Sequence, residues 1–274
     1  MKQKNHVKVS SRKEQFTDKV ATRIWYEEAS ADNPYLEEKS YCHGYDLLEL
    51  TRHCSYVDVF YLLFRGELPT EQERRVLEAL MVAYINPGPR HPASRAAMTA
   101  GVGKTDPAHI LPISQIVLGG AFAGAGEVEV AMRFLQKKCR KDPVELSGEL
   151  LQQEIKSNEE GDIHIAPGFG SHYGGIDSLA RQRAEYLLSL VESSHVLRWG
   201  HSFALALEPH GMGWLNIGVV AAVLAELGFT PRAGAGLYQI ISAPGLLAHG
   251  IELANKPITA MPFVDDQHYV IEKN

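Results

Sequence analysis

A proline-rich loop carries the first side chains that could do chemistry. Residues 86–92 contain three prolines and one glycine, which exclude a regular helix there. His91 lies in this loop beside Arg90, and Ser94 and Arg95 follow closely. An imidazole with two guanidinium groups suits the binding of a carboxylate. A histidine that caps the loop explains the same residues equally well, so both interpretations stay open.

A second group follows the segment Pro-Gly-Phe-Gly. Ser171 and His172 come directly after it, and Asp177 stands at the start of a predicted helix over 176–191. Histidine can hydrogen-bond a carbonyl group and a carboxylate can act as a general base, so these two join His91 as candidate catalytic residues. Ser171 is a further candidate for binding substrate. The alternatives are a surface or packing histidine and a carboxylate that caps the helix.

The composition limits the class of protein. The chain has 274 residues, 45% of them hydrophobic and 22% charged, as in ordinary globular proteins. A net charge of −6 argues against nucleic acid as a main partner. Cys42, Cys54 and Cys139 form no CxxC pair, so we expect a reducing compartment and no metal site. Without a signal segment or a stretch of about 20 apolar residues, we expect a cytoplasmic protein with no membrane partner.

The spacing of apolar residues predicts an all-α protein. Thr70 is an expected N-cap, because Glu73 three residues later completes a capping box. Glycine and alanine crowd the segment 110–135, where we expect helices to pack closely. The segments predicted to be helical are 45–64, 71–84, 144–155, 176–191, 213–227 and 231–253.

Six short motifs occur in a fixed order along the chain. They are GYD at 44–46, GELPT at 66–70, GAGE at 124–127, PGFG at 167–170, LNIG at 215–218 and GLLAHGIE at 245–252. In this order they resemble the citrate synthase superfamily, which includes citryl-CoA lyases and part of ATP-citrate lyase. The resemblance covers about residues 40 to 270, nearly the whole chain.

The resemblance implies a helical fold of two domains that forms a homodimer. The implied large, dimerisation domain comprises 21–129 and 226–274, and a small domain at 130–225 interrupts it. Before them, the basic segment 1–20 is predicted to be a flexible tail.

The resemblance also implies a ligand. Pro167, Gly168, Phe169 and Gly170 match the loop that contacts coenzyme A in this superfamily. Coenzyme A or an acyl-CoA is therefore the expected substrate, with no covalently bound cofactor. A simple turn between helices is the alternative.

The reacting groups of the superfamily are replaced in this sequence. Its chemistry needs a carboxylate base, two histidines and substrate-binding arginines. By the same match, Phe122 stands in place of the enolate-stabilising histidine, Ser171 in place of the second histidine and Gly218 in place of the base. The expected arginines fall on Ser242 and near Gly175. Losing a general base alone forfeits about 10²–10⁴ in rate, so we expect no ordinary citrate synthase activity.

Two hypotheses therefore stand side by side. The first is a diverged enzyme that forms or breaks a carbon–carbon bond in an acyl-CoA, with a substrate other than citrate or oxaloacetate. The second is a catalytically inactive homologue with a ligand-binding, regulatory or scaffolding role. The first predicts that His172 and His91 reach one pocket.

Overall fold

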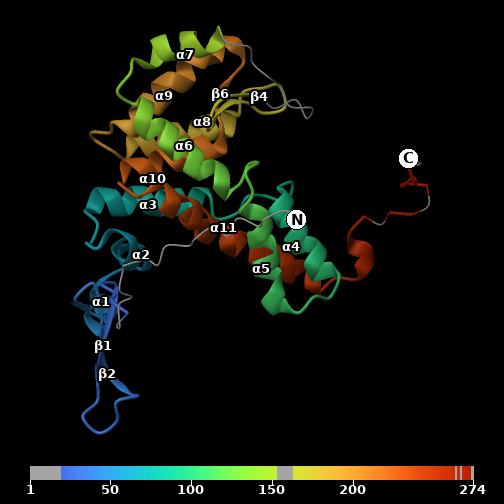
Figure 1. Ribbon diagram of the computed structural model, residues 1–274. Helices are drawn as coiled ribbons and strands as arrows, with labels where there is room; N and C mark the ends of the chain where they lie inside the picture. Colours follow the sequence, from blue (N-terminus) through green and yellow to red (C-terminus); the bar gives the residue numbers. More distant parts are fainter. Residues whose placement is uncertain (1–19, 153–162, 263, 266, 273–274) are drawn as a thin grey trace, which may run out of the picture. The chain divides into compact units, whose positions relative to one another are not determined.

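The computed structural model describes residues 20–152, 163–262, 264–265 and 267–272. This part of the chain contains eleven α-helices and two three-stranded sheets, which confirms the predicted helical class (Figure 1). Contacts divide the chain into two units, Met1–Ser55 and Tyr56–Asn274. Apart from its last residue, the predicted tail at 1–20 lies outside the described residues.

The first unit is a small antiparallel sheet followed by one helix. Its elements are β1 (Trp25–Ala29), β2 (Glu37–Cys42), β3 (Tyr45–Asp46) and α1 (Leu47–His53). Both residues between β2 and β3, His43 and Gly44, have positive φ angles, as a two-residue hairpin turn requires. The prediction of continuous helix from Tyr45 was therefore wrong, because this segment begins as a strand and its helix ends at His53.

The second unit carries the remaining helices and the second sheet. Its main elements are α2 (Tyr56–Arg65), α3 (Glu71–Ala83), α4 (Pro92–Val102), α5 (Pro107–Leu118), α6 (Ala125–Lys138), α7 (Pro143–Leu151), β4 (Ile163–Ala166), β5 (Phe169–Ser171), α8 (Ser178–Ser189), α9 (Val196–Leu207), β6 (Gly213–Trp214), α10 (Asn216–Glu226) and α11 (Pro231–Ala254). Two short 3₁₀ turns complete it, η1 (Glu208–His210) and η2 (Ile258–Ala260).

Several helix boundaries follow from capping residues. The predicted capping box is present, because Glu73 N donates to Thr70 Oγ1 at 3.3 Å and Thr70 N donates to Glu73 Oε2 at 2.8 Å. Thr230 caps α11, with Pro231 in the first turn. Predicted helix 144–155 corresponds to α7, and its last residues from 153 onward lie outside the described part.

The core of the second unit is organised around α10 and α11. Helix α11 packs against α4, α5, α6 and α10, and residues Val219 to Leu224 of α10 are completely buried. Gly101 of α4 lies directly against Gly250 of α11, where an added Cβ would collide with the carbonyl group. Gly124 likewise meets the backbone of Gly120, which agrees with the close packing expected in this segment.

The segment 167–170 is a hairpin and not a loop between helices. Strands β4, β5 and β6 form an antiparallel sheet in that order, and Pro167 and Gly168 make the turn. Phe169 stacks on Trp214 of β6 with ring centroids 4.5 Å apart. Three strands of two to four residues are too short to show an alternating pattern. The predicted small domain at 130–225 remains a prediction.

Candidate active site

One cavity brings together most of the predicted chemistry. It has a volume of about 500 Å³ and lies within the second unit. Arg90, His91, His172 and Asp177 all line it, and so does Phe122. The two histidines therefore reach one pocket although 80 residues separate them in sequence. This is the arrangement that the enzyme hypothesis predicts.

Other predicted residues do not line this cavity. Ser94 is completely buried within α4, Arg95 is exposed, and Ser171 is buried in β5. Ser242 is buried on α11 and donates to the carbonyl oxygen of Tyr84 at 3.2 Å. These contacts give no support to direct substrate binding by Ser94, Arg95 or Ser171.

His91 uses both ring nitrogens for backbone contacts. Its Nδ1 accepts from Ala93 N at 3.1 Å and so caps α4. The proton therefore lies on Nε2, which donates to the carbonyl oxygen of Ala123 at 3.0 Å. Ala123 has a φ of 49°, a left-handed conformation that this bond helps to hold. The capping interpretation of His91 thus describes its contacts in this structure.

Asp177 is also a capping residue. One carboxylate oxygen, Oδ1, accepts from Leu179 N at 3.0 Å and Ala180 N at 2.9 Å at the start of α8. The other oxygen, Oδ2, accepts from Asn216 Nδ2 at 2.6 Å. Both oxygens are therefore occupied, and the carboxylate holds the start of α8 against the start of α10.

Arg183 is a site residue that the sequence analysis missed. It lines the same cavity, its Nη1 donates to Asn216 Oδ1 at 2.7 Å, and its guanidinium lies 4.8 Å from the ring centroid of Tyr84. Arg183 thereby places a positive charge on the wall of this cavity. The available signal was its helical spacing from Ala180 and Leu187, which are buried residues of α8.

Two buried tyrosines supply neutral hydroxyl groups. Tyr84 and Tyr238 line the cavity and are almost fully enclosed. Burial raises the pKa of Tyr84 well above its ordinary value and raises the pKa of Tyr238 to about 12. At neutral pH both phenols keep their protons and remain potential hydrogen-bond donors to a ligand.

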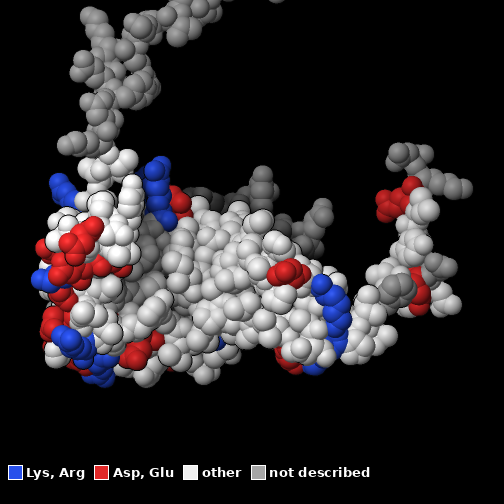
Figure 2. Space-filling view, turned by 90° about the horizontal axis from the view of Figure 1, so that it is seen from below, with Lys and Arg blue, Asp and Glu red and all other residues white. Residues whose placement is uncertain are grey.

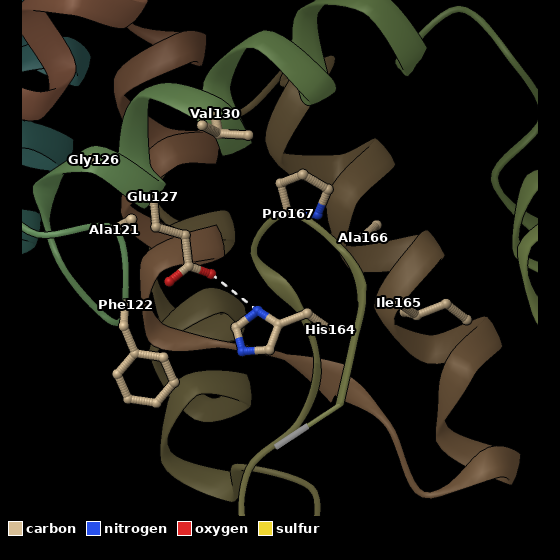
Figure 3. Close-up of a pocket in the computed structure, with 9 residues that line it drawn as sticks. All are labelled: Ala121, Phe122, Gly126, Glu127, Val130, His164, Ile165, Ala166 and Pro167. Carbon is tan, nitrogen blue, oxygen red and sulfur yellow. Dashed lines mark ion pairs between the residues drawn. The ribbon is translucent and has the colours of Figure 1, made fainter. Parts of the chain in front are cut away.

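A glutamate and a histidine that the sequence analysis did not predict as site residues also line the cavity. Glu127 of α6 accepts from Ala123 N at 3.1 Å through Oε2, and its Oε1 lies 3.2 Å from Nδ1 of His164 on β4. Figure 3 shows the two side chains pointing toward each other. Glu127 ends the GAGE motif, whereas nothing in the sequence around His164 indicates a site.

A second cavity adjoins the first. It also has a volume of about 500 Å³, and its walls are mostly apolar (Figure 3). Phe122, Glu127 and His164 line both cavities. Pro167 lines the second one, whereas Phe169 and Gly170 are buried in the sheet.

Gly168 and Gly218 form a direct backbone contact. A Cβ added to Gly218 would collide with the carbonyl oxygen of Gly168, which also accepts from Leu215 N at 3.0 Å. Gly168 has a φ of 81°, so its turn favours glycine as well. The position that resembles the family's base therefore has no room for a side chain in this structure.

Comparison with solved structures identifies the fold. The chain matches a citryl-CoA lyase from Hydrogenobacter thermophilus with a TM-score of 0.75 and 24% identity, over 93% of this chain and 94% of that one. It matches a citrate synthase from Thermoplasma acidophilum with a TM-score of 0.58 and 19% identity, over 80% of this chain and 58% of that one. The chain has the citrate synthase-like fold.

Another solved structure with the citrate synthase-like fold contains ligands. An ATP citrate lyase from Methanothrix soehngenii, in complex with citrate and coenzyme A, matches with a TM-score of 0.69 and 16% identity. The match covers 94% of this chain and 44% of that one. No family model and no curated protein matches the sequence. Within the described residues, no helix is both long enough and apolar enough to span a membrane.

Proposed function

We propose that this protein is an enzyme that acts on an acyl-CoA thioester. It forms or cleaves a carbon–carbon bond, and its second substrate is neither citrate nor oxaloacetate. The observation that carries the proposal is the shared cavity, in which His172, His91 and Asp177 meet within a citrate synthase-like fold. Solved structures with this fold include one with citrate and coenzyme A.

The charges around the cavity favour a substrate with few carboxylates. Arg90 and Arg183 supply two positive charges, whereas Glu127 and Asp177 supply two negative ones. Arg183 already donates one hydrogen bond to Asn216. A trianion such as citrate would lack enough counter-charge here, and burying an unpaired charge is costly. One carboxylate bound by Arg183 fits this balance better.

The alternative is a catalytically inactive homologue with a ligand-binding, regulatory or scaffolding role. The contact between Gly168 and Gly218 favours it, because that contact excludes a base at the position that resembles the family's. An inactive protein would leave a thioester unchanged, whether or not it binds one. The alternative is therefore separable from the enzyme by product analysis.

Under either hypothesis we propose a cytoplasmic homodimer. Helix α5 contains no Lys, Arg, Asp or Glu and exposes Ile116 at 79%, with Ile113 and Val117 also exposed. Figure 2 shows a broad area of the surface on which charged side chains are sparse. Light scattering at micromolar concentration should give a dimer, and Ile116→Glu should weaken it. A monomeric wild-type protein would count against the proposed pairing.

A ligand series tests the proposed activity. Thermal unfolding is measured with coenzyme A, acetyl-CoA, longer acyl-CoAs, oxaloacetate and citrate, and each ligand that stabilises the protein is followed by mass spectrometry. A ligand at one hundred times its Kd stabilises the fold by about 2.7 kcal/mol. Stabilisation by thioesters with a new product supports the enzyme, and stabilisation without product supports the inactive homologue. No effect of any thioester would refute the enzyme and leave the inactive homologue with a regulatory or scaffolding role.

A further inference from the structure

Within the described part of the chain, no carboxylate forms an ion pair with Arg183. This arginine lines the cavity and is half-buried. Arg181, two residues earlier in the same helix, differs in this respect, because it pairs with both Glu185 and Glu208. A partly buried charge without a counter-ion is unfavourable, and a bound anion removes that cost. Arg183 is therefore a candidate binding group for an anionic ligand.

Two contacts fix the position of the Arg183 guanidinium. Its central carbon lies over the ring of Tyr84, 4.8 Å from the ring centroid. Its Nη1 donates to Asn216 Oδ1 at 2.7 Å. Asn216 in turn donates from Nδ2 to Asp177 Oδ2 at 2.6 Å, so its amide oxygen faces Arg183. A guanidinium that is already held in place loses little conformational freedom when it binds an anion.

The surroundings of Arg183 favour a ligand with a single carboxylate. A guanidinium can donate two parallel N–H bonds to the two oxygens of one carboxylate. Nη1 is bonded to Asn216, and the edge formed by Nε and Nη2 makes no hydrogen bond to any described residue. Glu127 and Asp177 line the same cavity, and the other arginine of the cavity, Arg90, is exposed. A second carboxylate or a phosphate would therefore meet negative charge.

The second substrate also needs an electrophilic carbon, because the proposed reaction joins it to the carbon next to the thioester carbonyl. The hydroxyl group of Tyr84 is buried and has no hydrogen-bond partner among the described residues. Buried donors without an acceptor are rare. Since Arg183 lies over the ring that bears this hydroxyl, a carbonyl oxygen adjacent to the bound carboxylate would supply the acceptor.

We propose that Arg183 binds the carboxylate of the second substrate and that this substrate is a 2-oxo acid with one carboxylate, of which pyruvate is the simplest. This inference rests on the proposed function. The carbon next to the thioester carbonyl loses a proton, and its electron pair forms a bond to C2 of the oxo acid. The π electrons of the oxo group move to its oxygen, which takes up a proton and becomes a hydroxyl group. The reverse steps describe cleavage.

Direct binding of pyruvate tests the inference without turnover. An NMR titration measures the Kd of pyruvate for the full chain, with and without coenzyme A, and the Kd of methyl pyruvate, which lacks the charge. We expect Arg183→Gln to raise the Kd of pyruvate by about 10- to 150-fold, as the loss of a hydrogen bond to a charged group predicts. The Kd of the ester should hardly change. Arg183→Lys keeps the charge without the two parallel N–H groups, so it should recover only part of the affinity.

Two further variants complete the design. Arg181→Gln is the matched control, because Arg181 is also on α8 but is paired with Glu185 and Glu208 and does not line the cavity. It should bind pyruvate as the wild type does. Tyr84→Phe keeps the ring beside Arg183 and removes the hydroxyl, so it should reduce the preference for pyruvate over propionate, which has no oxo group. Thermal unfolding verifies that each variant folds.

The outcomes separate this inference from the proposed function. Wild-type protein that binds pyruvate no better than its methyl ester, or a folded Arg183→Gln variant that binds pyruvate as tightly as wild type, overturns the inference. An Arg183→Gln variant that loses affinity for coenzyme A but not for pyruvate also overturns it, since the guanidinium would then contact a phosphate. If pyruvate binding depends on Arg183 but no thioester is converted in its presence, the carboxylate site stands and the proposed reaction is refuted.

Discussion

Two places beside the cavities are built in opposite ways. At the glycine contact, Gly168 and Gly218 meet backbone to backbone and leave no space for a side chain. In the polar bracket, formed by His91, Ala123, Glu127 and His164, side chains hold the backbone of Ala123 from both sides. The bracket thus places polar side chains at the cavities, whereas the glycine contact places none there.

The difference shows how one fold combines a contact that serves packing with contacts that place polar groups at a cavity. The glycine contact locks the β4–β5 turn onto α10, so any side chain introduced there acts first on stability. The polar bracket combines support of the backbone with polar groups at the cavities, because the same carboxylate accepts from Ala123 N and lies 3.2 Å from His164 Nδ1. Substitutions in the two places should therefore affect different quantities.

We expect the largest loss of stability from a substitution at the glycine contact. Gly218→Asp restores the residue type expected for a base, yet its Cβ collides with the carbonyl group of Gly168. We expect a loss of about 3 kcal/mol in the free energy of unfolding, measured by urea denaturation, and no citrate synthase activity.

Gly148→Ala in α7 is the matched control, because a Cβ there meets nothing within 4 Å. It should be neutral or stabilise by about 0.4–1 kcal/mol. A Gly218→Asp protein that is as stable as wild type and has citrate synthase activity would contradict the distinction between the glycine contact and the polar bracket.

An alkaline transition should report the buried tyrosines of the cavity. The pKa of Tyr238 is raised by burial to about 12, against about 10 in the unfolded chain. Its contribution to stability is complete below pH 10 and is lost as the pH rises to 12, at about 1.4 kcal/mol per pH unit. Urea denaturation at several pH values measures this slope. Tyr238→Phe should reduce it, and an equal slope in that variant would contradict the assignment.

A moderate effect is expected from His91. His91→Ala removes the cap of α4 and the donor to Ala123 O, so we expect a loss of about 1–2 kcal/mol in unfolding free energy. His91→Asn retains a capping oxygen and should recover part of the loss. Equal losses in the two variants would show that the cap contributes little. No loss in either would remove His91 from the polar bracket.

The smallest effect is expected at Asp177. Asp177→Ala should cost about 1 kcal/mol, since the cap of α8 is lost, whereas asparagine caps nearly as well as aspartate. Asp177→Asn keeps the cap but cannot also accept from Asn216 Nδ2, so we expect a smaller loss of stability than in Asp177→Ala and the turnover of the wild-type protein. An Asp177→Asn variant that folds but has no turnover would identify Asp177 as the base.

Much of the helical frame could be predicted from the sequence. The ends of α3 and α11 are set by local signals, such as the Thr70–Glu73 capping box and Pro231, which act within a few residues. The two small sheets could not be predicted, because their strands have two to six residues and pair through turns that leave little periodic pattern.

The candidate site was predictable only in part. Polar residues in loops or at a helix start can be recognised from sequence as site candidates. Four such residues line one cavity, namely Arg90, His91, His172 and Asp177. Local spacing could not identify Arg183, Glu127 and His164 as site residues. They are placed at the cavity by contacts between α6, α8, α10 and the second sheet. The reason for glycine at 218 is likewise a contact with a residue fifty positions away.

The most direct test of the central claim is a crystal structure with carboxymethyl-coenzyme A, an unreactive analogue of acetyl-CoA. If the proposed function is right, the carboxymethyl group will lie in the cavity that His91, His172 and Asp177 line. A carboxymethyl group bound outside this cavity, or an analogue that does not bind at all, would contradict it.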